Sequence, residues 1–166
     1  MNNFLFIASE NDAIPKCKVG GVGDVIRDVP RQIARRGDQV HVVVPSYSRL
    51  HHNGILVSKL HIQLREVTYV AYLYEVPAKV EDGNIRHYVI HHPEIEAGNI
   101  GGIYHNDPEE PFYTDVIKYI IFCTAVAEAM KKGLFGDINI VHLHDWHSSL
   151  MLFLQKYHPA YKELRK

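Results

Sequence analysis

Cysteine is scarce in this sequence of 166 residues, where Cys17 and Cys123 are the only two. Two cysteines cannot form the disulfide framework of a small secreted domain, so the sequence favours a reducing setting. Long hydrophobic runs are also lacking, and none reaches the roughly 20 apolar residues of a membrane helix. The N-terminus lacks the basic-then-apolar layout of a signal peptide. We therefore expect a cytoplasmic protein.

An excess of charge of one sign is the other absence. The formal net charge is −1 and the sequence pI is about 6.9, so bulk electrostatics favour neither nucleic acid nor an anionic membrane as a partner. Apolar residues make up 46% and charged residues 22% of the chain, which is typical of globular proteins. The length predicts one domain with a substantial core.

The first third of the chain has the pattern of a strand, a helix and a second strand. Residues 4–8 and 39–45 are apolar and β-prone, as in strands buried on both faces. Between them, residues 20–36 predict a helix that ends before Gly37, a left-handed C-cap. Its expected buried stripe consists of Val22, Val25, Ile26, Val29 and Ile33. This order predicts a right-handed βαβ unit with parallel strands.

The remaining segments complete an α/β pattern. Residues 54–92 alternate polar and apolar positions around an EDGN turn, which predicts an antiparallel meander. A long loop, residues 93–111, precedes a helix over residues 115–132, a buried strand over 138–145 and a helix over Trp146–Tyr157. We expect a Rossmann-like, mostly parallel sheet with helices on both faces and an inserted antiparallel meander.

The glycine-rich stretch KCKVGGVGDV, residues 16–25, lies between the first strand and the first helix. It is not a P-loop, because Lys18 precedes the glycines and no Ser or Thr follows them. It is not a dinucleotide fingerprint either, since the third glycine position falls on Ile26 and no acidic residue ends the second strand. Two interpretations remain open: an anion site at a helix N-terminus, or a merely flexible entry loop.

The segment HLHDWH, residues 142–147, resembles a metal-binding cluster, because His142 and His144 share one face of a strand. However, Asp145 comes one place too early for the hydrolase pattern His-x-His-x-Asp-His. Only His158 follows, so no later cluster completes a ligand set. We expect no metal at this site.

Four segments, in order, resemble the bacterial glycogen synthases and plant starch synthases. The first, KVGGVGDV, follows Ser9-Glu10 and is similar to the family's Lys-x-Gly-Gly-Leu, small residue, Asp-Val; Val22 replaces the usual leucine. The others are RGDQV with VPSY, IYHND with FYTD, and VHLHDWH, at residues 36–47, 103–115 and 141–147. Together they extend over most of the chain.

The resemblance implies that residues 1–166 form the N-terminal domain of a two-domain retaining glucosyltransferase of the GT-B type. Such an enzyme moves glucose from ADP-glucose or UDP-glucose to the non-reducing end of an α-1,4-glucan, with no cofactor or catalytic metal. Its location would be the cytoplasm, or the plastid in a plant. With the C-terminal nucleotide-binding domain absent, we expect no complete catalytic set and an inactive fragment. The alternative is a non-catalytic module that binds carbohydrate or nucleotide with the same fold.

Carried over residue by residue, the resemblance assigns Lys18 and the amides of Gly20 and Gly21 to the donor phosphates. It assigns four side chains to the sugars: Asp24, Tyr104, Asp145 and His147. Each of the four also has a purely structural interpretation. Asp24 suits the helix dipole and Asp145 suits a helix cap, Tyr104 fits a loop residue covering the sheet, and His147 fits a surface histidine.

Overall fold

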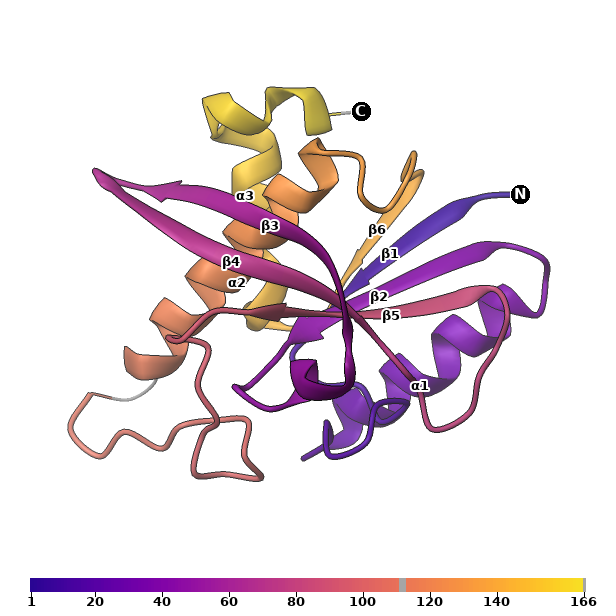
Figure 1. Ribbon diagram of the computed structural model, residues 1–166, viewed down its shortest axis with the longest axis horizontal. Helices are drawn as coiled ribbons and strands as arrows, with labels where there is room; N and C mark the ends of the chain where they lie inside the picture. Colours follow the sequence, from indigo (N-terminus) through magenta and orange to yellow (C-terminus); the bar gives the residue numbers. More distant parts are fainter. Residues whose placement is uncertain (111–112, 166) are drawn as a thin grey trace.

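The computed structural model describes residues 1–110 and 113–165 (Figure 1). Phe112, part of the third family-like segment, lies outside the described residues. In chain order the elements are β1 (Asn3–Ile7), α1 (Gly21–Ala34), β2 (Gln39–Pro45), η1 (Leu50–Asn53), β3 (Ile55–Leu64), β4 (Val67–Val76), β5 (Ile85–His91), α2 (Tyr113–Lys131), β6 (Ile140–Leu143), α3 (Trp146–Tyr157) and η2 (Pro159–Leu164).

The described strands form one mixed sheet in the order β3-β4-β5-β2-β1-β6. Strands β5, β2, β1 and β6 are parallel, whereas β4 is antiparallel to both of its neighbours. The register of β1 against β2 pairs Phe4 with Val40 and Ile7 with Val43. This confirms the expected α/β class, with a mostly parallel sheet and a β3-β4-β5 meander.

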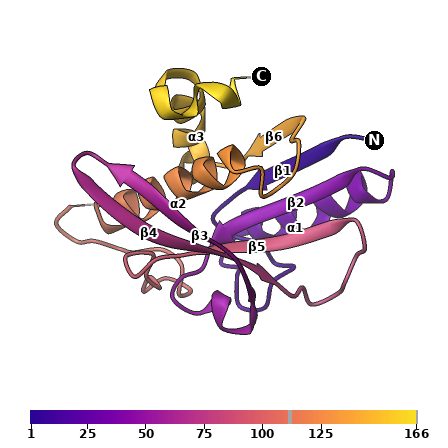
Figure 2. The same ribbon diagram turned by 45° about the horizontal axis from the view of Figure 1, so that its top comes forward.

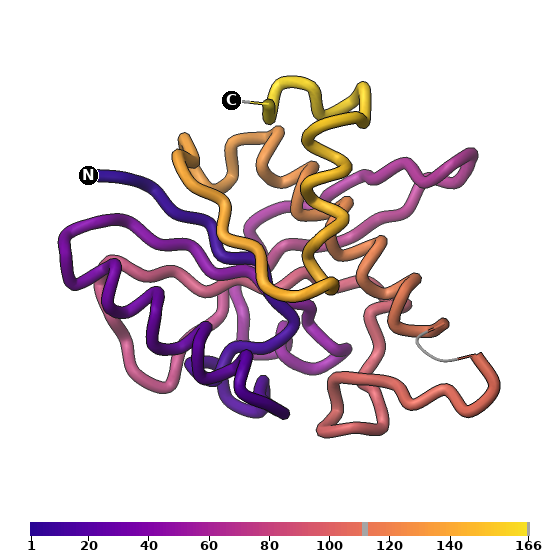
Figure 3. The backbone as a smooth tube through the Cα atoms, turned by 180° about the vertical axis from the view of Figure 1, so that it is seen from behind, coloured from indigo at the N-terminus to yellow at the C-terminus, as the bar shows by residue number. Residues whose placement is uncertain are grey.

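Helices cover both faces of the sheet, with α1 on one side and α2 and α3 on the other (Figures 1 and 2). Alternate strand residues supply the two cores, because successive side chains of a strand point to opposite faces. Phe6 and Val42 pack in the core with Ile26 of α1, whereas Leu5 and Ile7 pack in the core with α2. The loop after β5 projects from the body of the molecule, away from the C-terminus (Figure 3).

The buried face of α1 differs from the expected stripe. Val25 and Val29 are exposed, and the buried positions are Gly23, Ile26, Pro30 and Ala34. These four also share one helical face, and three of them are small or compact. The sequence prediction was right for Ile26, and Val22 and Ile33 are partly buried against the same core, but it was wrong for Val25 and Val29. It followed the largest apolar residues, whereas compact residues form much of the face that α1 turns to the sheet. Gly37 does adopt a left-handed conformation, with φ of 93°.

The strand expected to be buried over residues 138–145 is instead a short edge strand. β6 covers only Ile140–Leu143, and none of its side chains is buried. Among the described residues β6 pairs with β1 alone, so its outer edge has no strand beside it. An apolar sequence predicted a strand correctly here but could not reveal its position in the sheet.

The carboxyl ends of the parallel strands bring distant loops together. Ile7 pairs with Leu143, and the His144 amide donates to the Ile7 carbonyl at 3.1 Å. The residues after β1 therefore lie beside the residues after β6. Ligands of open α/β sheets collect at this edge.

Candidate functional site

Glu10 organises the glycine-rich loop. This side chain is 2% exposed, and its Oε2 accepts hydrogen bonds from the amides of Val19 and Gly20, both at 2.7 Å. The Glu10 carboxylate is thus already the acceptor for the amides of Val19 and Gly20. No side chain caps α1, which begins at Gly21. The positive end of the α1 dipole is a potential anion site, although the Glu10 carboxylate already lies beside it.

Position 23 requires glycine because a larger side chain would crowd its neighbours, and not because of the backbone conformation. A Cβ there would lie 2.9 Å from Lys18 Cγ and 3.2 Å from Glu10 Oε2. Gly20 has extended backbone with φ of −127°, and a Cβ on Gly21 would meet nothing within 4 Å. Absence of side chains at Gly20 and Gly21 leaves the start of α1 open to an approaching ligand.

Lys18 and Asp24 form an ion pair across the loop. Lys18 Nζ lies 2.6 Å from Asp24 Oδ1, and both side chains are about two-fifths exposed. Arg27 contacts the same Asp24 oxygen at 3.1 Å. Asp24 therefore holds the loop as well as facing solvent, and an incoming phosphate would compete with it for Lys18.

Tyr104 is joined to this loop through Glu10. Its hydroxyl donates to Glu10 Oε1 at 2.6 Å and lies 2.8 Å from Ser9 Oγ. Burial and the adjacent carboxylate raise the pKa of Tyr104, so the hydroxyl stays a donor. Its ring centroid lies 5.2 Å from that of His147.

The segment that carries Tyr104 is packed against the glycine-rich loop. A Cβ on Gly101, which has φ of 59°, would lie 2.3 Å from Val19 Cγ2. The Arg49 guanidinium donates to the carbonyls of Lys16 at 2.9 Å and Gly101 at 3.4 Å, and so bridges the two segments. The loop containing residues 16–20 and the loop containing Tyr104 form one continuous surface.

Asp145 lies directly after β6 in a strained backbone conformation, with φ of 58° and ψ of −179°. This region is populated essentially by glycine. The Asp145 side chain is exposed and makes no capping hydrogen bond to α3, so the structural interpretation as a helix cap is wrong. Its charge influences the pKa values of Tyr104 and His147, which places the three side chains in one neighbourhood.

His147 is not the surface histidine that its position in the sequence suggested. It is 8% exposed, and its ring lies 4.6 Å from Tyr119 and 4.3 Å from Trp146, measured between centroids. Burial lowers its pKa, which favours the neutral imidazole. Nδ1 of His147 is buried without a hydrogen-bond partner in the described structure. Such an orphaned polar atom is costly unless a ligand or water completes it.

The structure thus brings all seven predicted residues to one edge of the sheet. Lys18, Gly20, Gly21 and Asp24 lie in the glycine-rich loop, and Tyr104, Asp145 and His147 lie around the ends of β1 and β6. Glu10 links the two groups, and sequence reasoning missed it. The available signal was its place in Ser9-Glu10, an acidic residue at the carboxyl end of a buried strand.

His142 and His144 pair with each other rather than with a third ligand. Nδ1 of His142 lies 2.8 Å from Nε2 of His144, and both rings stack on Phe6. Within the described ranges, no group of three potential ligands is arranged to hold a metal ion. Both cysteines are free and buried, and burial raises each thiol pKa to about 12.

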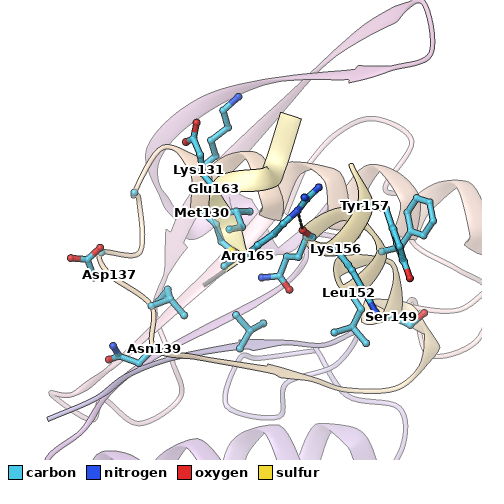
Figure 4. A pocket seen from close by; sticks show the side chains of 17 residues that line it. Met130, Lys131, Asp137, Asn139, Ser149, Leu152, Lys156, Tyr157, Glu163 and Arg165 are labelled. Atoms are coloured by element: carbon cyan, nitrogen blue, oxygen red, sulfur yellow. Dashed lines mark hydrogen bonds between the residues drawn. The ribbon is translucent and has the colours of Figure 1, made fainter. Parts of the chain in front are cut away.

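A hollow of about 1330 Å³ lies elsewhere, towards the C-terminal half of α3 (Figure 4). It is lined by Leu152, Lys156 and Tyr157 together with the end of α2 and residues 163–165. None of the seven predicted site residues lines it. The candidate site is instead at the carboxyl edge of the sheet, where the strained Asp145 and the buried Nδ1 of His147 lie.

Comparison with known families agrees with the residue pattern. The family model of the starch synthase catalytic domain matches residues 3–166. The chain belongs to this family. Its relatives include the glycogen synthase of Streptococcus uberis, 29% identical over 97% of this chain and 32% of that protein. Soluble starch synthase 2-2 of Oryza sativa subsp. japonica, a chloroplastic or amyloplastic protein, is 32% identical over 94% of this chain and 22% of that protein.

The fold also matches a solved member of the family. The catalytic domain of starch synthase IV from Arabidopsis thaliana, bound to ADP and acarbose, superposes with a TM-score of 0.72 at 21% identity. The match covers 99% of this chain and 32% of that chain. This chain therefore spans about a third of the length of the glycogen synthases that it matches. In the part that the structure describes, no helix has the length and apolar character needed to cross a membrane.

Proposed function

We propose that this chain forms the N-terminal domain of a retaining glucosyltransferase, which transfers glucose from ADP-glucose or UDP-glucose to the non-reducing end of an α-1,4-glucan. The family membership supports this reaction class. The observation that carries the proposal is the convergence of a helix N-terminus and a set of polar and aromatic groups, joined by Glu10.

In this proposal, the start of α1 and Lys18 bind the donor diphosphate. Negative charge grows on the diphosphate as its bond to glucose breaks, and a fixed dipole and a cation stabilise that charge. Because Glu10 already accepts from the Gly20 amide, the Gly21 amide is the better placed of the two for a phosphate oxygen. Binding through Gly20 would require Glu10 to release it.

The sugar would lie against Tyr104, Asp145 and His147. A tyrosine gives a sugar a flat apolar face together with a hydroxyl. Asp145 accepts hydrogen bonds from sugar hydroxyls, and the unpartnered Nδ1 of His147 supplies one further polar contact. The strain at Asp145 fits a residue retained for its side chain rather than for the backbone.

Two titrations of the chain test the two halves of the site separately. Trp146 is 44% exposed and contacts His147, so maltoheptaose at millimolar concentrations should change its fluorescence. Pyrophosphate should shift the amide NMR signals of residues 19–24, weakly and with salt sensitivity. Lys18→Ala should remove most of the pyrophosphate response and leave the maltoheptaose response intact.

Asp145→Asn should have the converse effect, weakening maltoheptaose binding about tenfold while the pyrophosphate shifts persist. A sugar response that survives this substitution unchanged would reject the assignment of Asp145. Shifts from pyrophosphate that appear outside residues 19–24 would reject the phosphate role. If sugar binds but every anion response is absent, the non-catalytic carbohydrate module becomes the better description.

A further inference from the structure

Lys118 is a lysine buried completely inside the domain. It lies on α2, its side chain is 0% exposed, and its Nζ contacts Asp115 Oδ1 at 2.7 Å. The same Nζ donates to the carbonyl of Ile103 at 2.6 Å. Lysine is almost never fully buried unless it is paired, and Asp115 supplies the partner that makes this burial possible.

The Asp115–Lys118 pair contacts the chain on both sides of Tyr104. Lys118 binds the Ile103 carbonyl, and Asp115 Oδ2 accepts from the His105 amide at 3.1 Å. The His105 ring also meets Asp115, with Nδ1 lying 3.1 Å from Oδ1. The backbone immediately before and after Tyr104 is therefore fixed to the first turns of α2.

This fixing matters because the loop has little regular structure of its own. One isolated bridge, between Ile100 and Tyr104, is described within it. Gly101 and Gly102 have positive φ values of 59° and 70°, and glycine leaves a chain conformationally permissive. Contacts with the rest of the domain therefore contribute much of what selects one conformation for Tyr104.

Lys118 also contacts the aromatic groups beneath the site. Its Nζ lies 5.3 Å from the Tyr47 ring centroid and 5.7 Å from that of Tyr119. The Tyr119 ring in turn meets the rings of His147 and Trp146. The Lys118 ammonium thus contacts the Ile103 carbonyl, next to Tyr104, and also the Tyr119 ring, which packs against His147.

Stability alone does not account for such a pair, because replacing a buried ion pair by apolar groups of similar volume is often neutral or stabilising. We propose that Lys118, with Asp115, is a positioning residue that fixes Tyr104, and His147 through Tyr119, for binding an α-1,4-glucan. This inference rests on the proposed function. It concerns no direct contact between Lys118 and the sugar.

The test uses the whole chain and the variant D115L/K118M, which removes both charges and leaves neither one buried alone. Urea unfolding should remain a single cooperative transition. Maltoheptaose binding, followed by Trp146 fluorescence, should weaken about tenfold. Hydrogen exchange of the amides in residues 100–106 should accelerate at least tenfold without any ligand.

The matched control is Lys132→Met. Lys132 also donates to a backbone carbonyl, that of Lys59 at 3.1 Å, but it lies at the far end of α2. Lys132→Met should change neither maltoheptaose binding nor the hydrogen exchange of residues 100–106.

A double-mutant cycle with Tyr104→Ala separates positioning from general destabilisation. If the pair acts largely through Tyr104, D115L/K118M should cost clearly less sugar affinity once Tyr104 is removed, and the remaining loss is the part that acts through His147. Should the two losses simply multiply, the positioning role is wrong while the proposed function stands. If Tyr104→Ala itself leaves sugar binding unchanged, both the proposed sugar site and this inference fail.

The variant K118R keeps the experiment decisive if the double substitution does not fold. Arginine keeps the charge but places a planar guanidinium where a compact ammonium fits. We expect a folded chain with faster exchange at residues 100–106 and weaker sugar binding. Wild-type exchange and wild-type affinity in K118R would overturn the proposal.

Discussion

Asp145 carries a backbone conformation that an aspartate adopts only at a cost. Positions of this kind cost about 1–3 kcal/mol and persist where the surroundings enforce them. The Ser148 amide and hydroxyl contact the Asp145 carbonyl at 3.3 and 3.2 Å, which anchors the residue in place. If Asp145 binds the sugar as proposed, stability and sugar binding favour different residues at this position.

Asp145→Gly should stabilise the chain and weaken its sugar response. Glycine relieves the strain but is more flexible in the unfolded chain, so the expected net gain is about 1 kcal/mol in the free energy of unfolding by urea. Arg65→Gly is a control with positive φ, 55°, in the hairpin between β3 and β4. It should leave maltoheptaose binding unchanged. A full sugar response in Asp145→Gly would contradict this account of the aspartate.

Asp24→Asn should strengthen anion binding at the glycine-rich loop, because it frees Lys18 from its ion pair. Exposed pairs are worth about 0.2–1 kcal/mol, so pyrophosphate affinity should rise by up to about fivefold at low salt. Asp28→Asn provides the control, since Asp28 pairs with Arg27 rather than with Lys18. Equal effects from the two substitutions, or none from Asp24→Asn, would mean that Lys18 is not restrained by Asp24.

At the scale of elements, β5 and the loop after β1 are joined by a buried histidine. His87 of β5 is 7% exposed, and its Nδ1 lies 3.0 Å from Nδ2 of Asn11. Burial, with a smaller contribution from Arg31, lowers the pKa of His87 to about 4. The amide of Asn11 donates to the unprotonated nitrogen, so protonation would also break this contact.

The fold should consequently lose stability as the pH falls from about 6.5 towards 4. The pKa of His87 is below its ordinary value, so the unfolded chain binds the proton first, and the stabilisation is complete only above pH 6.5. The loss attributable to His87 is on the order of 3 kcal/mol. His87→Gln should flatten the pH profile of urea unfolding. The stability difference between wild type and variant should shrink from pH 7 to pH 4.5, and a constant difference would contradict the assignment.

Sequence periodicity predicted most elements well because the evidence for them is local. β2 and α3 have the expected bounds, and Gly37 and Gly133 adopt positive φ after α1 and α2. The exposure of Val25 could not be predicted, because the choice of the face that α1 turns to the sheet depends on packing. The strand β6 was predicted, but its exposure was missed for the same reason.

The parts of the candidate site that lie within one short segment could be predicted from the sequence. The glycine-rich loop and residues 142–147 have recognisable patterns, whereas Glu10 acts through Tyr104, which is 94 residues away. Asp115 and Lys118 likewise act on a loop whose position only the folded chain defines. Long-range hydrogen bonds of this kind have no periodicity by which a sequence could reveal them.

At the scale of the whole molecule, we expect this chain alone to bind ligands without transferring glucose. Lys18 is exposed and paired with Asp24, and charge interactions in a solvated site are worth only about 1 kcal/mol each. Enzymes typically lower their barriers by about 8 kcal/mol or more. Labelled ADP-glucose or UDP-glucose with glycogen should give no incorporation. A full-length glycogen synthase from Streptococcus uberis is the positive control, and measurable transfer by this chain would show that the site is already sufficient.

Because β1 lies inside the sheet, its pairing can be completed only late in translation. β1 is hydrogen-bonded to β2 on one side and to β6 on the other. Strand β2 is complete once residue 45 has been synthesised, but strand β6 ends only at residue 143. At about 5–20 residues per second, the far edge of β1 stays open for roughly 5–20 s of translation. A nascent chain with an open, apolar strand edge is a natural client for chaperones during that interval.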